Sequence, residues 1–142
     1  MDLSIIILAN NEEKTIFDLV SKLKKKYPNI LVVVAKRSKD NTCELAKSAG
    51  ARVIYDDGNG HGAAKRLGIK EANTDVVVLM DADGSHDPVT IKDLLNKLSN
   101  YDLAVGSRYV RGGKIVGWKL FRFLLSYFGN IYSRLITGLI IK

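Results

Sequence analysis

The feature that most constrains the fold is a regular alternation of short apolar runs with segments that carry helix signals. Apolar runs rich in β-branched residues occur at residues 3–8, 30–35 and 76–80, and such runs are typical of strands covered on both faces. Between them, acids in a first turn and a closing glycine are typical of helices. We expect strands at residues 3–8, 30–35, 51–55, 75–80 and 103–105, and helices at residues 10–26, 40–49, 63–72, 88–98 and 118–136. Strands that alternate with helices predict an α/β fold with a mostly parallel sheet.

Four polar segments follow predicted strands. They read ANNEE, AKRSKD, DDGNGHG and DADGSHDP. In parallel sheets, ligands bind beyond the carboxyl ends of the strands. The sequence therefore predicts a binding site built by these four loops at one edge of the sheet.

The chain of 142 residues is long enough to bury the core of one domain, and its formal net charge is +7. The charge is uneven: residues 1–101 hold 15 basic and 14 acidic residues, whereas residues 102–142 hold 7 basic residues and one acid. We therefore expect an anionic partner on the C-terminal side, either phosphate groups, an anionic membrane surface or nucleic acid. The single Cys43 is expected to be a reduced thiol in an intracellular protein.

No segment predicts a signal peptide or a spanning helix. The N-terminal apolar run is too short, and the longest uncharged run near the C-terminus, residues 123–133, is about half of the ~20 residues that a bilayer requires. We expect a cytoplasmic protein, peripheral at the membrane's cytoplasmic face.

Asp81 and Asp83 stand at the end of a predicted strand, two residues apart. Both carboxylates could hold a hard divalent cation, Mg²⁺ or Mn²⁺, with substrate phosphates completing its shell. Alternatively, Asp81 caps the following turn and Asp83 is solvated. An EF-hand is excluded, because the glycine comes too early and Lys92 stands where a bidentate acid is required.

The chain resembles the family 2 glycosyltransferases with the GT-A fold, in particular the dolichyl- or polyprenyl-phosphate mannose synthases. The resemblance is carried by IIILANNEE, GNGHGAAKRLGI, VVVLMDADGSHDP and DLAVGSRYVRGG followed by W, R, S and N. It implies a Rossmann-like α/β domain with helices flanking the sheet. Residues 1–113 would bind the nucleotide sugar, and residues 114–142 would form a basic aromatic helical segment of the same domain on the acceptor and membrane side.

The resemblance also implies an activity, namely transfer of mannose or glucose from a GDP- or UDP-sugar to a polyprenyl or dolichyl phosphate. Asp81, Asp83 and Arg108 would be catalytic, and Asp81, Asp83 and Ser85 would hold the cation. The donor would bind at Ala9, Asn11, Glu12, Gly60, Lys65, Asp81 and Ala82, and the acceptor phosphate at Arg108, Arg122 and Ser126. A phosphate acceptor is already an anion and needs no general base. Two alternatives remain open: the arginines form a solvated basic face, and His86 is either a loop residue or a substrate contact.

Three departures from the family pattern stand out. The second strand ends in Ala35, Lys36 and Arg37, where the family carries two aspartates and a glycine. Lys and Arg donate hydrogen bonds only, so a base N–H loses its acceptor there. Leu8 and Asn10 replace a proline and a tyrosine, and His61 stands where lysine is frequent. The chain stops at Lys142, before an acid and a glycine-phenylalanine-arginine motif, so we expect a C-terminally incomplete domain.

The last predicted helix mixes aromatic and basic side chains. This composition is typical of the interface of an anionic bilayer, but the apolar residues could also pack on the sheet or on a second chain. The rival hypothesis is therefore a shortened, inactive relative that binds a membrane or a partner subunit. We expect no nucleic-acid partner, because no motif of that class is present.

Overall fold

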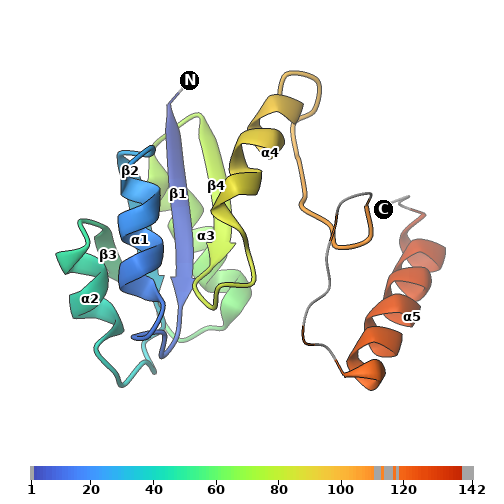
Figure 1. The fold of residues 1–142 in the computed structure, drawn as a ribbon, viewed down its shortest axis with the longest axis horizontal. Helices are drawn as coiled ribbons and strands as arrows, with labels where there is room; N and C mark the ends of the chain where they lie inside the picture. Colours follow the sequence, from blue (N-terminus) through green and yellow to red (C-terminus); the bar gives the residue numbers. More distant parts are fainter. Residues whose placement is uncertain (1, 111–112, 114–116, 118, 139–142) are drawn as a thin grey trace. The chain divides into compact units, whose positions relative to one another are not determined.

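The computed structural model describes residues 2–110, 113, 117 and 119–138 (Figure 1). The chain divides into two units, Met1–Ile91 and Lys92–Lys142. The functional division that the sequence predicts after residue 113 stays a prediction. Trp118, the expected first residue of the last helix, lies outside the described residues.

A parallel sheet with helices on both faces forms the N-terminal unit. Its elements are β1 (Leu3–Ala9), α1 (Ile16–Lys24), β2 (Asn29–Val34), α2 (Thr42–Ser48), β3 (Arg52–Tyr55), α3 (His61–Ala72), β4 (Val76–Asp81) and a 3₁₀ turn (Pro88–Thr90), with α4 (Ile91–Lys97) beginning at the unit boundary. The strand order is β3-β2-β1-β4, and all three neighbouring pairs are parallel. The α/β class and the first four strands predicted from the sequence are confirmed.

The fifth predicted strand, at residues 103–105, is wrong, since the described residues form a sheet of four strands only. Leu103 and Val105 are 77% and 66% exposed. The three apolar residues 103–105 do not pair with any strand of the sheet. Without those hydrogen bonds, the segment is not held against the core, and the side chains of Leu103 and Val105 lie in solvent.

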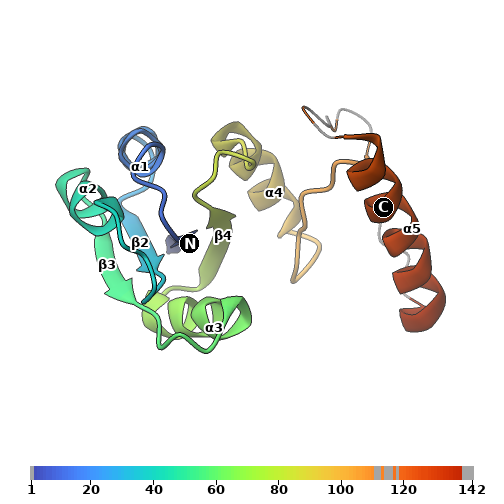
Figure 2. The ribbon, with the colours of Figure 1, turned by 90° about the horizontal axis from the view of Figure 1, so that it is seen from below.

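The core lies between the sheet and the helices. Helices α1 and α2 cover one face of the sheet and α3 covers the other (Figure 2). Ile5, Ile6 and Ile7 are completely buried, as expected of a strand covered on both sides. Gly68 lets α3 approach closely, because a Cβ at this position would lie only 2.6 Å from Cγ2 of Ile6.

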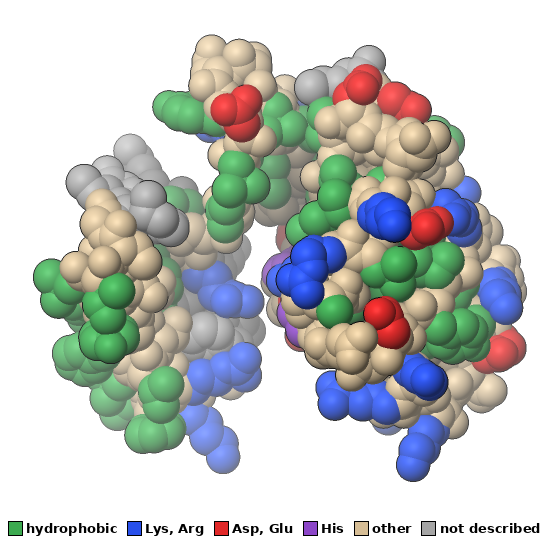
Figure 3. All heavy atoms as spheres, turned by 180° about the vertical axis from the view of Figure 1, so that it is seen from behind, with side chains coloured by type: hydrophobic (Ala, Val, Ile, Leu, Met, Phe, Trp, Pro, Cys, Tyr) green, Lys and Arg blue, Asp and Glu red, His purple; other side chains and the backbone are tan. Residues whose placement is uncertain are grey.

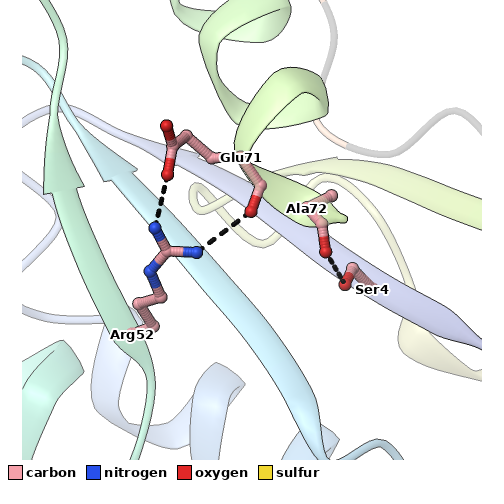
Figure 4. A network of polar contacts seen from close by, with 4 residues as sticks. All are labelled: Ser4, Arg52, Glu71 and Ala72. Carbon is pink, nitrogen blue, oxygen red and sulfur yellow. Dashed lines mark hydrogen bonds and ion pairs between the residues drawn. The ribbon is translucent and has the colours of Figure 1, made fainter. Parts of the chain in front are cut away.

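The end of α3 is attached to the sheet by polar contacts (Figure 4). The Arg52 guanidinium on β3 donates to the carbonyl oxygen of Glu71 at 3.0 Å and forms an ion pair with the Glu71 carboxylate. Ser4 Oγ on β1 donates to the carbonyl oxygen of Ala72 at 3.3 Å. These contacts join the end of α3 to the starts of β1 and β3, at the edge of the sheet opposite to the polar loops.

The first helix begins later than the sequence predicts. Residues 10–15 form a loop and turn in which Asn11 has a φ of +58°, and α1 starts at Ile16. The loop is fixed by side chains from residues 38–42, which accept the N–H groups of Asn11, Glu12 and Glu13. These bonds replace the first helical turn that the acids predict.

The C-terminal unit contains one long helix, α5 (Leu120–Thr137), with no buried residue. Polar residues recur along α5 every four positions, at Arg122, Ser126, Asn130 and Arg134, which puts them on one stripe. Figure 3 shows hydrophobic side chains along one side of this unit and Lys or Arg side chains along another. In the part of the chain that is described, no helix is long and apolar enough to cross a membrane.

Candidate functional site

A cleft of about 570 Å³ lies at the carboxyl ends of the strands in the N-terminal unit. All four polar loops predicted to meet at this edge contribute to it. Its lining residues are Leu8, Ala9, Asn10, Glu12, Val33, Ala35, Lys36, Arg37, Asp56, Gly58, Gly60, His61, Ala64, Asp81, Ala82 and Asp83. The cleft thus joins the first glutamate, the glycine loop and both aspartates, which lie up to 71 positions apart in the sequence.

Asp81 lies between two imidazoles. His61 Nε2 is 3.8 Å from Asp81 Oδ1, and His86 Nε2 is 4.0 Å from Asp81 Oδ2. The backbone N–H of Asp81 donates to Nδ1 of His86 at 3.1 Å, so the proton of a neutral His86 ring is on Nε2, towards the carboxylate. Of the two readings of His86, this contact favours a loop residue that orients Asp81.

The segment after Asp81 is fixed by β1 and by the residue before α1. Ala82 N–H donates to the Leu8 carbonyl oxygen at 3.1 Å, and Thr15 Oγ1 donates to the Ala82 carbonyl oxygen at 2.8 Å. Asp83 Oδ1 accepts the N–H of Ser85 at 2.9 Å. The backbone between the two aspartates is therefore held by β1 and by the residue before α1, which places both side chains at the cleft.

The side chains of the cleft can hold a divalent cation only if a bound ligand supplies further oxygen atoms. No group of three or more His, Cys, Asp or Glu side chains suited to a metal occurs among the described residues. Asp81 and Asp83 supply carboxylate oxygens to the cleft, which suit Mg²⁺ or Mn²⁺ when phosphate oxygens and water supply the remaining positions. Ser85 does not line the cleft, and its backbone N–H donates to Asp83 Oδ1.

The side of the cleft next to β2 and β3 carries both positively and negatively charged side chains. Lys36 and Arg37 line it from the end of β2, and Asp56 lines it from the end of β3. Asp56 Oδ1 accepts two backbone N–H groups, from Lys36 at 2.7 Å and from Gly58 at 3.1 Å. Sequence analysis missed Asp56, although an acid directly after an apolar strand is the same signal that singled out Asp81.

A second cleft, of about 490 Å³, lies beside the first. It is lined by Asn11, Glu12, Glu13, Lys14, Thr15, Lys39 and Asp40, so Glu12 lies in both clefts. Asn11, predicted to bind the donor, lines only this second cleft, where its Oδ1 accepts the N–H of Lys39 at 2.8 Å. Burial alone would raise the pKa of Asp40, but hydrogen bonds from Thr42, Glu13 and Ser38 outweigh burial and lower that pKa.

The other predicted donor residues divide between the cleft and its surroundings. Gly60 lines the cleft at the start of α3, with a φ of +89° that favours glycine. Lys65 lies one turn into α3 and does not line the cleft. His61, which stands where the family often has lysine, lines it instead.

The predicted acceptor residues lie in the C-terminal unit. Arg122 and Ser126 stand four residues apart on α5, which puts them on one face. Tyr109, the neighbour of Arg108, donates its hydroxyl to Ser126 Oγ at 2.8 Å. The loop that carries Arg108 is therefore attached to α5 at the predicted phosphate site, and Tyr109 is a further residue of this cluster that the sequence analysis missed.

Residues 4–140 match the family model described as Glycosyl transferase family 2. The chain belongs to this family. It is 36% identical over 135 residues to a dolichol-phosphate mannosyltransferase of Pyrococcus furiosus, covering 89% of this chain and 38% of the relative. It is 35% identical to an undecaprenyl-phosphate mannosyltransferase of Micrococcus luteus, covering 94% of this chain and 59% of the relative. The family that the sequence motifs predict is confirmed.

The solved structure of the M. tuberculosis glucosyl-3-phosphoglycerate synthase is similar in fold, with a TM-score of 0.62 and 24% sequence identity. The alignment covers 69% of this chain and 40% of that structure. The predicted GT-A fold is confirmed. The chain spans 38% of the length of the first of the two mannosyltransferases named above and 59% of the length of the second.

Proposed function

We propose that the chain forms the donor-binding part of a glycosyltransferase that moves mannose or glucose from a GDP- or UDP-sugar to a polyprenyl or dolichyl phosphate. The observation that carries this proposal is the cleft, which collects five of the seven predicted donor residues, Ala9, Glu12, Gly60, Asp81 and Ala82, together with Asp83. The related mannosyltransferases named above support the choice of sugar and acceptor.

In this proposal the diphosphate of the donor lies near Asp81 and Asp83. The two carboxylates hold Mg²⁺ or Mn²⁺, which would offset the negative charge that develops on the departing diphosphate. Thr15 fixes the position of these acids through its bond to the carbonyl oxygen of Ala82. Gly60 lets the backbone at the start of α3 come close to the ligand.

The acceptor phosphate binds to Arg108, Arg122 and Ser126. One guanidinium group can donate two parallel hydrogen bonds to two oxygens of a phosphate, and it remains charged at every physiological pH. The phosphate oxygen attacks the anomeric carbon, the bond from that carbon to the diphosphate breaks, and the nucleoside diphosphate leaves. No proton has to be removed from the acceptor.

The exposed side of α5 binds the membrane surface where a lipid phosphate resides. Phe121, Tyr132 and Leu135 are 74%, 67% and 79% exposed. Lys119 and Arg122 supply positive charge to the same helix for anionic headgroups. The protein would then act at the cytoplasmic face, as a peripheral protein that a second copy or another subunit could accompany.

Calorimetric titration with GDP and UDP, each with and without Mn²⁺, tests the donor site. We expect binding that requires Mn²⁺ and that Asp83→Ala weakens by about tenfold or more, because a carboxylate ligand of the cation is lost. Asp18→Ala, which removes an exposed acid of α1 outside the cleft, is the matched control and should bind like the wild type. Equal loss in both variants would mean that net charge alone governs binding.

A second candidate is a shortened relative that binds a membrane or partner without catalysis. The specific observation in its favour is that Lys36 and Arg37 line the cleft at the end of β2, where a base N–H needs an acceptor. Absence of binding of either nucleotide at about 1 mM with Mn²⁺, in a chain that still binds anionic vesicles, would decide for this candidate.

A further inference from the structure

Three strands end at the same level around the part of the cleft that lacks the family acid. Ala9 pairs with Val34, and Val34 pairs with Tyr55. The ladder continues by one step, since Ala35 N–H donates to the Ala9 carbonyl oxygen at 2.8 Å and Asp56 N–H donates to the Val34 carbonyl oxygen at 3.0 Å. Asn10, Ala35 and Asp56 therefore form a row across β1, β2 and β3, with the small Ala35 in the middle.

Asp56 stands one strand away from the missing acid, about 5 Å in a parallel sheet. Its side chain is half-buried and lines the cleft. One carboxylate oxygen is fixed by the N–H groups of Lys36 and Gly58. Its Oδ2 accepts no hydrogen bond from any residue the structure describes. The carboxylate is thus held in place by one oxygen and offers the other to a ligand.

The other end of the row has a buried acceptor. Asn10 Oδ1 is buried, lines the cleft side of β1, and has no hydrogen-bond partner among the described residues. A buried polar atom without a partner costs free energy. Asp56, which is half-buried and lines the cleft, is therefore the acceptor of this row that a ligand can reach.

We propose that Asp56 reads the base of the donor nucleotide by accepting a ring N–H through Oδ2, while Lys36 or Arg37 donates to the carbonyl oxygen beside that N–H. This inference rests on the proposed function, and it names the residue that takes over from the acid absent at the end of β2. The ligand class is a nucleoside diphosphate with a keto base, uracil or guanine.

The chemistry of the bases explains this selection. Uracil and guanine present a ring N–H next to a carbonyl oxygen, whereas the corresponding ring nitrogens of cytosine and adenine are acceptors without a hydrogen. A carboxylate only accepts, and Lys and Arg only donate. A cytosine or adenine ring nitrogen would therefore face the lone pairs of Asp56 and leave both groups without a partner.

Titration of UDP, GDP, CDP and ADP with Mn²⁺ into the wild type, Asp56→Asn and Asp57→Asn tests this assignment. In Asp56→Asn, the amide oxygen can still accept from Lys36 and Gly58, but an NH₂ donor replaces Oδ2. The wild type should bind UDP or GDP about tenfold or more tightly than CDP and ADP, and Asp56→Asn should abolish this preference. Binding of Mn²⁺ with inorganic pyrophosphate should be the same in all three proteins.

Asp57→Asn is the matched control, because Asp57 is the exposed neighbouring acid that does not line the cleft. It should keep the preference of the wild type. If Asp56→Asn keeps it as well, the assignment of Asp56 is wrong while the donor site stands. If the wild type binds no nucleotide, the proposed function fails and the assignment falls with it. An unchanged thermal unfolding midpoint in Asp56→Asn excludes unfolding as the cause of a lost preference.

Discussion

The two units of this chain differ in where their apolar side chains lie. In the N-terminal unit, β1 and β2 are almost entirely buried between helices. In the C-terminal unit, no described residue after Ile91 is buried, although α5 consists mainly of apolar residues. The first unit is stabilised by its own core, whereas α5 exposes a side that a membrane or another protein surface would cover.

This difference separates two kinds of proposed functional residue. Asp56, Asp81 and Asp83 stand at the ends of strands whose positions are fixed by the ladder and the core. Arg122 and Ser126 stand on α5. Within its unit, this helix is joined to the loop before it by the hydrogen bond from the Tyr109 hydroxyl to Ser126 Oγ. Most of the stability of a helix in a protein comes from packing of its apolar face, so covering the apolar side of α5 should also order the proposed acceptor site.

The largest expected effect tests whether the stability of the chain resides in the N-terminal core. Ile6→Ala should lower the free energy of unfolding by about 2–5 kcal/mol, because it leaves a cavity beneath α3. Leu135→Ala on α5, where the side chain is 79% exposed, should change it by less than about 0.5 kcal/mol. Urea unfolding followed by circular dichroism measures both. Similar losses in the two variants would contradict the contrast between the units.

A pair of glycine substitutions gives the next largest effect. Gly68→Ala should destabilise by about 1–3 kcal/mol, because the new methyl group meets Ile6 in a tightly packed core. Gly129→Ala should stabilise α5 slightly, because a Cβ at that position meets nothing within 4 Å and alanine favours helix. Opposite signs in thermal unfolding are expected. A neutral Gly68→Ala would mean that α3 can move away from the sheet.

Vesicle binding tests what covers α5. The double substitution Phe121→Ser with Phe128→Ser should weaken binding to phosphatidylglycerol vesicles by about tenfold or more, because two exposed aromatic side chains on one helix face no longer enter the interface. Phe17→Ser, at a 43% exposed position on α1, is the control and should bind normally. Sedimentation with vesicles measures the partition. A wild type that does not sediment would favour a protein surface as the cover.

The smallest effect concerns the loops that support the cleft. Hydrogen bonds lower the pKa of Asp40 in the folded protein, so the ionised carboxylate stabilises the fold at pH values above its unfolded pKa of about 3.9. This contribution is lost as the pH falls through the lowered folded value. Thermal unfolding should show wild type more stable than Asp40→Asn near neutral pH, with the difference shrinking below about pH 4. A difference independent of pH would contradict this role.

The elements with strong local patterns were predicted correctly from the sequence. The runs at β1 and β2 are buried because their side chains are apolar on both faces. The run at β4, an edge strand, forms a strand as predicted but is buried only at Val76 and Met80, and Leu79 is 39% exposed. The acids at the end of β4 do line a cleft. The start of α1 was predicted too early, because the N–H groups of residues 11–13 bind side chains that are 27 to 30 positions away. Such long-range bonds leave no signal in a local pattern.

By itself, the sequence determined the parallel α/β fold, the family and the edge of the sheet that carries the polar loops, because the alternation of strands and helices along the chain follows from patterns of a few residues. Only the tertiary structure decided that Asp56 lies level with Ala35, that two histidines flank Asp81, and that Tyr109 contacts Ser126. The physical reason is that side chains from different elements become neighbours through strand register and helix packing, and those distances are fixed only when the chain is folded.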